Sequence, residues 1–231
     1  ATEVAVTKED DLWLPSSNIM INYTMGGGIP YGRILEAFGQ ESSGKSLLSM
    51  DFAKCCQQLG GIVLWADAEM AFTESWAKEN GLDLDKIYIF PEQSIEKISD
   101  WIADMSLALR SQLINNEPIL LVVDSTAALD CNDNINSEAI DAKAEMGNRA
   151  KAIYKMFRTR NGMLSNLGIT SIFINQLRSK VGASKYEDPD TTPGGAALKF
   201  YASQRIGLYA GKQLKGKVLR ECYSSQEQVL R

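Results

Sequence analysis

The residues Gly39-Gln-Glu-Ser-Ser-Gly44-Lys45-Ser46 have the types and spacing of a phosphate-binding loop. Glycines let backbone N–H groups approach phosphate oxygens, and a helix that follows the loop offers the positive end of its dipole. Lys45 supplies a full positive charge, and the Ser46 hydroxyl is suited to hold Mg²⁺. The pattern predicts a nucleoside triphosphate site whose contacts come from Gly39, Glu41, Ser42, Ser43, Gly44, Lys45 and Ser46.

The flanking residues have the pattern that such a loop requires. Arg33–Phe38 is an apolar segment that predicts a strand before the loop, and Leu47–Leu59, without Gly or Pro, predicts a helix after it. This strand–loop–helix order makes a chance match to the motif much less credible.

Two carboxylates are expected to act beside the loop. Pro118–Asp124 is a predicted buried strand that ends in Asp124, which is placed to position Mg²⁺ together with Ser46. Glu69 follows a second predicted strand and is the candidate for polarising an attacking water. The chain has no histidine, so a base that activates water has to be a carboxylate. The alternative for Glu69 is an ordinary surface residue at the end of a strand.

Two further side chains could contact the nucleotide. Gln176 ends another predicted strand, where its amide can bond the γ-phosphate or the attacking water and shift when the phosphate leaves. Amides at strand ends also form ordinary turns, so this signal is weak alone. Trp76 could stack on the base of the nucleotide or belong to the core, and both alternatives stay open.

The charge is distributed unevenly. Residues 1–142 carry 8 Lys/Arg against 23 Asp/Glu, whereas residues 143–220 carry 15 against 4, within an overall net charge of −5. A basic half indicates a face for a polyanion, with a solvated basic surface as the alternative. The predicted helix Glu145–Arg160 concentrates this charge, with a basic face and one aromatic ring suited to nucleic acid. That face comprises Lys151, Tyr154, Lys155 and Arg158, opposite an apolar stripe of Met146, Ala150, Ile153 and Phe157.

Apolar, Ile- and Val-rich segments alternate with helical ones along the chain. The pattern predicts an α/β fold with a mostly parallel central sheet, helices on both faces and ligands at the carboxyl ends of the strands. The strands are expected at Ile62–Ala66, Ile87–Phe90, Ile119–Asp124 and Ile169–Gln176, and Ser94 is expected to cap a helix. Asp130–Ala142, polar and helix-poor, and Leu177–Pro193 are long connections that should emerge at the edge that holds the nucleotide.

The composition excludes several classes of protein. No apolar run is long enough to span a membrane, so no membrane partner is expected. The four cysteines fit neither a disulfide framework nor a C-x-x-C metal site, which favours reduced thiols and a cytoplasmic location. At 231 residues with 45% hydrophobic content, we expect one domain over residues 1–231.

Together these segments resemble the bacterial RecA recombinases, as a divergent or phage-borne member. The resemblance covers about residues 11–210 in family order. It rests on Gly28–Ile34, Gly39–Ser46, Asp67–Glu69, Val122–Ser125, Phe173–Arg178 and, most specifically, Thr191–Ser203.

The resemblance implies an ATP-dependent, Mg²⁺-requiring recombinase that forms a helical filament on single-stranded DNA and pairs it with homologous duplex DNA. It assigns Lys45, Glu69 and Gln176 to catalysis, Trp76 to the position that stacks on adenine, and the two long connections to DNA-binding loops. The candidate DNA-binding residues are Lys151, Tyr154, Arg158, Arg178, Lys180, Tyr186, Gly194 and Gly195. Lys199 and Phe200 fall at the subunit interface of the family.

The sequence also departs from the family pattern. Thr73 replaces an acidic residue near the adenine, and Tyr186 stands in a loop that is about one residue longer. The chain is expected to lack the usual N-terminal polymerisation helix, the lysine-bearing strand beyond Arg231 and the small C-terminal domain. The main alternative function is therefore a RecA-like scaffold or mediator that binds ATP and DNA but hydrolyses little. A RecA-type motor and a small-molecule kinase fit the Thr191–Ser203 segment and the basic helix less well.

Overall fold

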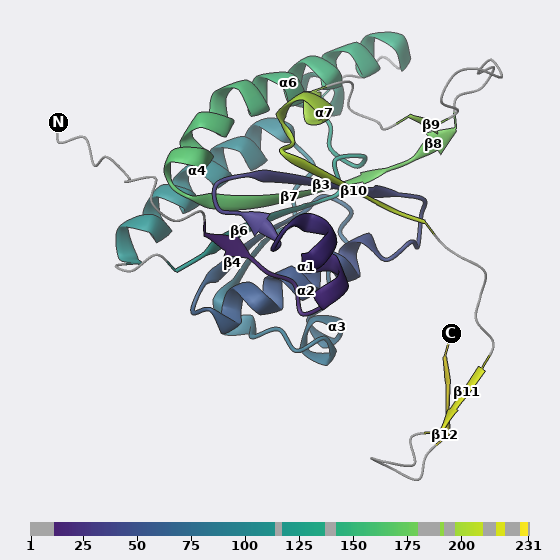
Figure 1. The fold of residues 1–231 in the computed structure, drawn as a ribbon. Helices are drawn as coiled ribbons and strands as arrows, with labels where there is room; N and C mark the ends of the chain where they lie inside the picture. The colour runs from purple at the N-terminus through teal and green to yellow at the C-terminus, as the bar shows by residue number, and fades with distance from the viewer. Residues whose placement is uncertain are drawn as a thin grey trace.

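The computed structural model describes residues 12–113, 117–136, 142–179, 190–191, 197–209, 216–219 and 227–230. Within these ranges, no helix is both long and apolar enough to cross a membrane. Figure 1 shows a central sheet with helices on both sides.

The centre of the fold is a six-stranded sheet in which every neighbouring pair is parallel. Its strands, in spatial order, are β10 (Gln204–Leu208), β3 (Ile34–Gly39), β7 (Ile169–Gln176), β6 (Ile119–Asp124), β4 (Ile62–Asp67) and β5 (Ile87–Phe90). The four strands expected from the apolar pattern are confirmed, and the strand before the phosphate loop begins and ends one residue later than expected. Because the strands are parallel, their carboxyl ends lie at one edge of the sheet.

Alternating side chains of the sheet belong to two separate cores. On β6, Ile119, Leu121 and Val123 pack with one cluster, and Leu120 and Val122 pack with the other, as the period of two in a strand requires. The first cluster is covered by α4 (Ile95–Gln112), α6 (Ala142–Asn166) and α7 (Ala197–Tyr201). The second is covered by α2 (Lys45–Gln58) and α3 (Glu74–Glu79), which lie on the other side of the sheet (Figure 1).

Short elements complete the described structure. β1 (Trp13–Leu14) pairs antiparallel with β2 (Ile29–Pro30), and α1 (Ile19–Met25) lies between them in sequence. A 3₁₀ turn, η1 (Leu84–Lys86), precedes β5. Two antiparallel pairs, β8 (Arg178–Ser179) with β9 (Asp190–Thr191) and β11 (Gly216–Leu219) with β12 (Glu227–Leu230), follow β7 and β10 in sequence. None of these pairs was predictable from the sequence, because runs of two to four residues carry too little periodicity.

Two expectations about the helices need correction. The apolar stripe predicted on α6 is buried only in part: Ile153 and Phe157 are buried, whereas Met146 is 69% exposed. Met146 therefore does not pack on the core as the periodicity suggested. The connection expected to be helix-poor contains α5 (Asn132–Ile135), whose polar residues bond locally: Asn134 donates to Asp130 Oδ1 at 2.6 Å. By contrast, Ser94 caps α4 as predicted, accepting from the Lys97 N–H at 3.2 Å.

Candidate functional site

The phosphate loop runs from the end of β3 into the first turn of α2. Gly44 occupies the left-handed region with φ of 92°, a conformation that residues with a Cβ rarely adopt, and it caps α2. Gly39 is constrained differently, since a Cβ there would lie 2.2 Å from the carbonyl oxygen of Leu208 on β10. Both glycines of the motif are thus required by geometry in this chain. The loop places the N-terminus of α2 at the carboxyl edge of the sheet.

Lys45 is buried within the loop. Its Nζ donates to the carbonyl oxygens of Gln40 at 2.6 Å and Gly39 at 3.3 Å. Burial lowers the pKa of this amine, while the negative charges of Glu69, Asp124 and Glu41 oppose that shift. These bonds hold the ammonium group over the loop, where a phosphate oxygen could exchange for a carbonyl oxygen as acceptor.

Ser46 and Asp124 meet across two elements that are far apart in sequence. Ser46 Oγ on α2 donates to Asp124 Oδ2 at the end of β6, over 2.8 Å. Burial raises the pKa of the Asp124 carboxyl to about 6; the Ser46 hydrogen bond counteracts the shift, and the charge of Glu69 adds to it. A hydroxyl and a carboxylate in contact beside a phosphate loop suit Mg²⁺, a hard cation that prefers oxygen ligands. A bound cation would favour the ionised carboxylate.

We expect an Asp124→Asn variant to be more stable than the parent chain at neutral pH without metal or nucleotide. The folded-state pKa is about 6 against the ordinary 3.8, so the unfolded chain releases this proton first as the pH rises. The parent therefore loses stability between about pH 4 and pH 6, by at most about 3 kcal/mol, whereas Asn does not titrate. Urea unfolding with a chelator at several pH values measures the difference.

The control for this measurement is Asp104→Asn, an exposed carboxylate on α4. Its stability relative to the parent should change little over the same range. A stability difference for Asp124→Asn that does not grow between acidic and neutral pH would contradict the assignment.

Glu69 is the point where three strand ends meet. Its Oε1 accepts a bond from Gln176 Nε2 on β7 at 3.1 Å and another from the Ser125 hydroxyl just beyond β6. The backbone N–H groups of Ala68 and Glu69 also donate to the Asp124 carbonyl, at 2.7 and 3.1 Å. The structure therefore brings the predicted base and the predicted γ-phosphate contact into direct contact with one another.

Trp76, the candidate for stacking on the adenine ring, lies on α3. Trp76 is partly buried and packs against the core cluster beneath α2, so the core alternative describes where its ring lies. Thr73 precedes α3 as its N-terminal cap residue. Whether Trp76 also stacks on adenine stays a prediction. Asp67, at the end of β4, instead secures the connection to α3 by accepting from the N–H groups of Ala71 and Phe72 at 3.1 and 3.0 Å.

The basic residues predicted to contact DNA form an exposed face on α6. Lys151, Lys155 and Arg158 are exposed, and Tyr154 is 47% exposed with its ring centroid 6.1 Å from that of Tyr201 on α7. Lys199 and Phe200, expected at a subunit interface, are exposed on α7, Phe200 to 78%. Arg178 lies in β8. Four further predicted residues, Lys180, Tyr186, Gly194 and Gly195, lie outside the described residues.

The segment after β6 is tied to the nucleotide edge by polar groups. The Gln93 side chain donates to the Ala68 carbonyl at 3.2 Å, and the backbone oxygen of Gln93 accepts from Asp130 N at 2.9 Å. Asn134 on α5 also donates to the Glu145 carbonyl on α6 at 2.9 Å. Neither Gln93 nor Ser125 was predicted to belong to the site, because single polar residues next to strand or helix ends carry no pattern. Only the adjacency of Ser125 to Asp124 could have drawn attention to it.

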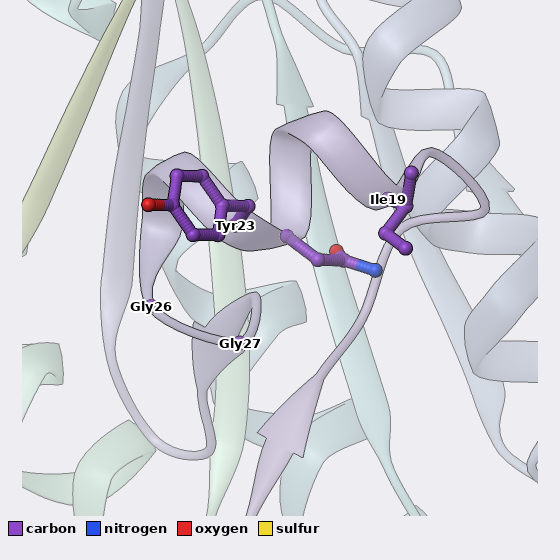
Figure 2. A pocket seen from close by; sticks show the side chains of 5 residues that line it. Ile19, Tyr23, Gly26 and Gly27 are labelled. Carbon is purple, nitrogen blue, oxygen red and sulfur yellow. The ribbon is translucent and has the colours of Figure 1, made fainter.

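A surface hollow near α1 is unrelated to this site. It is lined by Ile19, Asn22, Tyr23, Gly26 and Gly27, none of which was predicted to bind a ligand (Figure 2). The Asn22 amide is already bonded to the backbone of Ser16 through both its oxygen and its nitrogen, at 2.7 and 2.8 Å. The hollow therefore offers a mainly apolar wall and little polar recognition.

Comparison with known proteins agrees with this arrangement. A family model described as the RecA N-terminal domain matches residues 6–229. Protein RecA of Sulfurimonas denitrificans is 37% identical over 205 residues, which cover 84% of this chain and 57% of that protein. Protein RecA of Bacteroides thetaiotaomicron is 38% identical over 204 residues, covering 87% of this chain and 58% of the relative.

The relatives are longer than this sequence. For protein RecA of Ruminococcus albus, 38% identical over 210 residues, the match covers 89% of this chain but 50% of the relative. The chain thus spans about half the length of the curated relatives that it matches. Because the family model matches nearly all of the sequence and the fold is the expected one, the chain belongs to the bacterial RecA family.

Proposed function

We propose that this chain is the ATP-binding core of a DNA recombinase. It binds ATP and Mg²⁺ at the phosphate loop, hydrolyses ATP in response to single-stranded DNA, and self-associates into a helical filament. That filament pairs the bound strand with homologous duplex DNA. The observation that carries the proposal is the contact of Glu69 with Gln176 at the carboxyl edge of the sheet, beside the Ser46–Asp124 pair.

This geometry supports the role that we propose for each residue. Lys45 and the loop N–H groups bind phosphates, Ser46 and Asp124 hold Mg²⁺, and Glu69 polarises the attacking water. Phosphoryl transfer needs such positioning and charge stabilisation more than covalent chemistry. Membership of the RecA family supports the choice of ATP and DNA over other nucleotides and polyanions.

DNA binding is assigned to the face that carries the excess positive charge. The exposed cations of α6 and the residues that follow β7 belong to the basic part of the sequence. Residues 143–220 contain 15 Lys/Arg but only 4 Asp/Glu. Exposed Phe200 and Lys199 on α7 are the proposed contacts with a second copy, since a largely exposed Phe is suited to the core of an interface.

Gln176 is proposed to couple the two ligands. It ends β7, bonds Glu69 through its side chain, and is followed after one residue by β8. One residue can therefore respond to the γ-phosphate and displace the segment that contacts DNA. Linkage then requires ATP to raise DNA affinity by the same factor by which DNA raises ATP affinity.

We expect Gln176→Ala to bind ATP and DNA separately but to lose this mutual enhancement. Truncation removes the amide that contacts Glu69 and leaves the phosphate loop and α6 intact. ATP affinity is measured with and without single-stranded DNA in both proteins, and the parent should show an increase of roughly 5- to 150-fold, the usual range of allosteric coupling. Asn166→Ala, at the end of α6, is a matched amide control. A variant that retains the full enhancement would exclude Gln176 as the coupling residue.

The proposed function is tested most directly by the rate of ATP hydrolysis with and without single-stranded DNA. Strong stimulation supports the recombinase. DNA binding without turnover supports the alternative, a scaffold or mediator that binds both ligands and hydrolyses little. Absence of any response to DNA contradicts both.

A further inference from the structure

A carboxylate lies fully buried inside the sheet, in a place that the proposed chemistry does not use. Glu36 is the third residue of β3 and is 0% exposed, between Leu35 and Ala37, which are equally inaccessible. Burying an ionised carboxylate costs several kcal/mol unless strong partners compensate it, and an apolar residue of similar size would avoid that cost. The position therefore calls for a reason beyond packing.

Both oxygens of Glu36 have partners on neighbouring strands. Arg205 Nε on β10 donates to Oε2 at 2.5 Å, and Asn175 Nδ2 on β7 donates to Oε1 at 3.0 Å. The parallel register places Arg205 directly beside Glu36, and the Arg205 guanidinium also stacks over the Phe38 ring at 4.8 Å. Glu36 thus links the edge strand of the sheet to β7.

The bond to Asn175 reaches toward the candidate site. Asn175 Oδ1 accepts from the backbone N–H of Gln176 at 3.0 Å. The last β6–β7 pair is Val123 with Phe173, so the Gln176 N–H lies beyond that ladder and takes a side-chain acceptor instead. The amide of Asn175 is held in this orientation because its nitrogen is engaged by Glu36.

We propose that Glu36 is a positioning residue for Gln176: through Asn175 it fixes the backbone at the end of β7 and thereby aims the Gln176 side chain at Glu69. The series of contacts runs Arg205–Glu36–Asn175–Gln176–Glu69. Asn175 is fixed in one amide orientation because a carboxylate can only accept, which forces the amide nitrogen toward Glu36 and the oxygen toward Gln176. A Gln at position 36 would turn its oxygen toward Arg205, which can only donate, and its nitrogen toward Asn175, so the present amide orientation of Asn175 would lose its acceptor.

The inference deepens the proposed function, on which its catalytic meaning rests, yet its structural part can be tested alone. The variants are Glu36→Gln, Glu36→Leu, and the double exchange Glu36→Gln with Asn175→Asp. In the double variant the carboxylate sits at position 175, where it accepts from both residue 36 and the Gln176 N–H. In this variant residue 36 donates to residue 175 instead of accepting from it, but the Gln176 N–H keeps a side-chain acceptor.

The first readout is the NMR signal of the Gln176 side-chain amide, assigned by its disappearance in Gln176→Ala. We expect this signal to move in both single variants and to return toward the parent position in the double exchange. Ile102→Val is the control, because it loosens the core on the same face of the sheet without touching the polar series. If Glu36→Leu fails to fold, Glu36→Gln and the double exchange decide.

The second readout separates positioning from stability. With Mg²⁺, the preference for a non-hydrolysable ATP analogue over ADP should fall about tenfold in Glu36→Gln, while ADP affinity stays within about threefold, since the loss of one polar contact is worth roughly a factor of ten. The double exchange should recover the preference. Absence of nucleotide binding by the parent would contradict the proposed function, and the NMR comparison would still decide the role of Glu36.

Two results would overturn the inference. One is a Gln176 signal that stays in place in folded Glu36→Gln and Glu36→Leu. The other is a signal that moves as far in Ile102→Val as in the Glu36 variants, since Gln176 would then respond to general loosening of the core.

Discussion

Replacing Glu69 with Gln is expected to lower ATP turnover by about a hundredfold or more while nucleotide affinity changes little, the scale typical of losing a general base. Gln keeps the size of the side chain and the oxygen that accepts from Gln176 and Ser125, but it removes the charge that would polarise an attacking water. The measurement is kcat with saturating ATP and single-stranded DNA, together with the dissociation constant of ADP.

The control for Glu69→Gln is Glu74→Gln. Glu74 is exposed in the first turn of α3, so the same change of charge occurs nearby without a contact to Gln176 or Ser125. Its turnover should stay close to that of the parent. Equal turnover of parent and Glu69→Gln would return Glu69 to a structural role at the end of β4.

DNA affinity is expected to depend steeply on salt and to reside in α6. If about six phosphates of a single strand are contacted, affinity should fall by roughly two to three orders of magnitude between about 50 and 200 mM salt, since each contact releases condensed counterions. Removing Lys151 and Arg158 together should weaken binding and flatten the logarithmic slope by about 1.4. Fluorescence anisotropy with labelled single-stranded DNA over a salt series measures both quantities.

A double substitution of Lys78 and Lys86 serves as the control. Both side chains are exposed, and they lie on or near α3 rather than on α6, so the net charge changes equally. The slope should then match that of the parent. A parent whose affinity barely responds to salt would mean that the basic half of the sequence is only a solvated surface.

The parts of the fold that could be predicted from the sequence are the strands formed by apolar segments. β5, β6 and β7 begin and end where expected, because each is a short segment rich in Ile or Val that ends at polar residues or before a proline. β10 was missed, since Gln204, Arg205 and Gly207 interrupt its apolar pattern, although all five of its residues pair with the strand before the phosphate loop. Met146 was placed wrongly because helical spacing alone does not reveal where the core beneath a helix ends.

The candidate site was predictable in its residue types but not in its contacts. The loop motif and the order of strands gave Lys45, Ser46 and Asp124, and the parallel sheet then placed them at one edge. The bonds that join Glu69 to Ser125 and Gln176 depend on side-chain directions at the ends of three different strands. No local sequence pattern predicts contacts between the ends of different strands. The bond between buried Glu36 and Asn175 was unpredictable for the same reason.

Four aromatic rings in contact connect the exposed face of α6 to β7, the strand that leads to the nucleotide edge. Phe157 on α6 lies 4.8 Å from Phe173 on β7 and stacks at 5.6 Å on Tyr201 of α7, which in turn adjoins Tyr154. Close-packed interiors compress little and transmit strain, so we expect α6, α7 and the end of β7 to move together. A displacement of Tyr154 at the surface would therefore reach Phe173 on β7, three residues before Gln176. No change in the secondary structure between them would be needed.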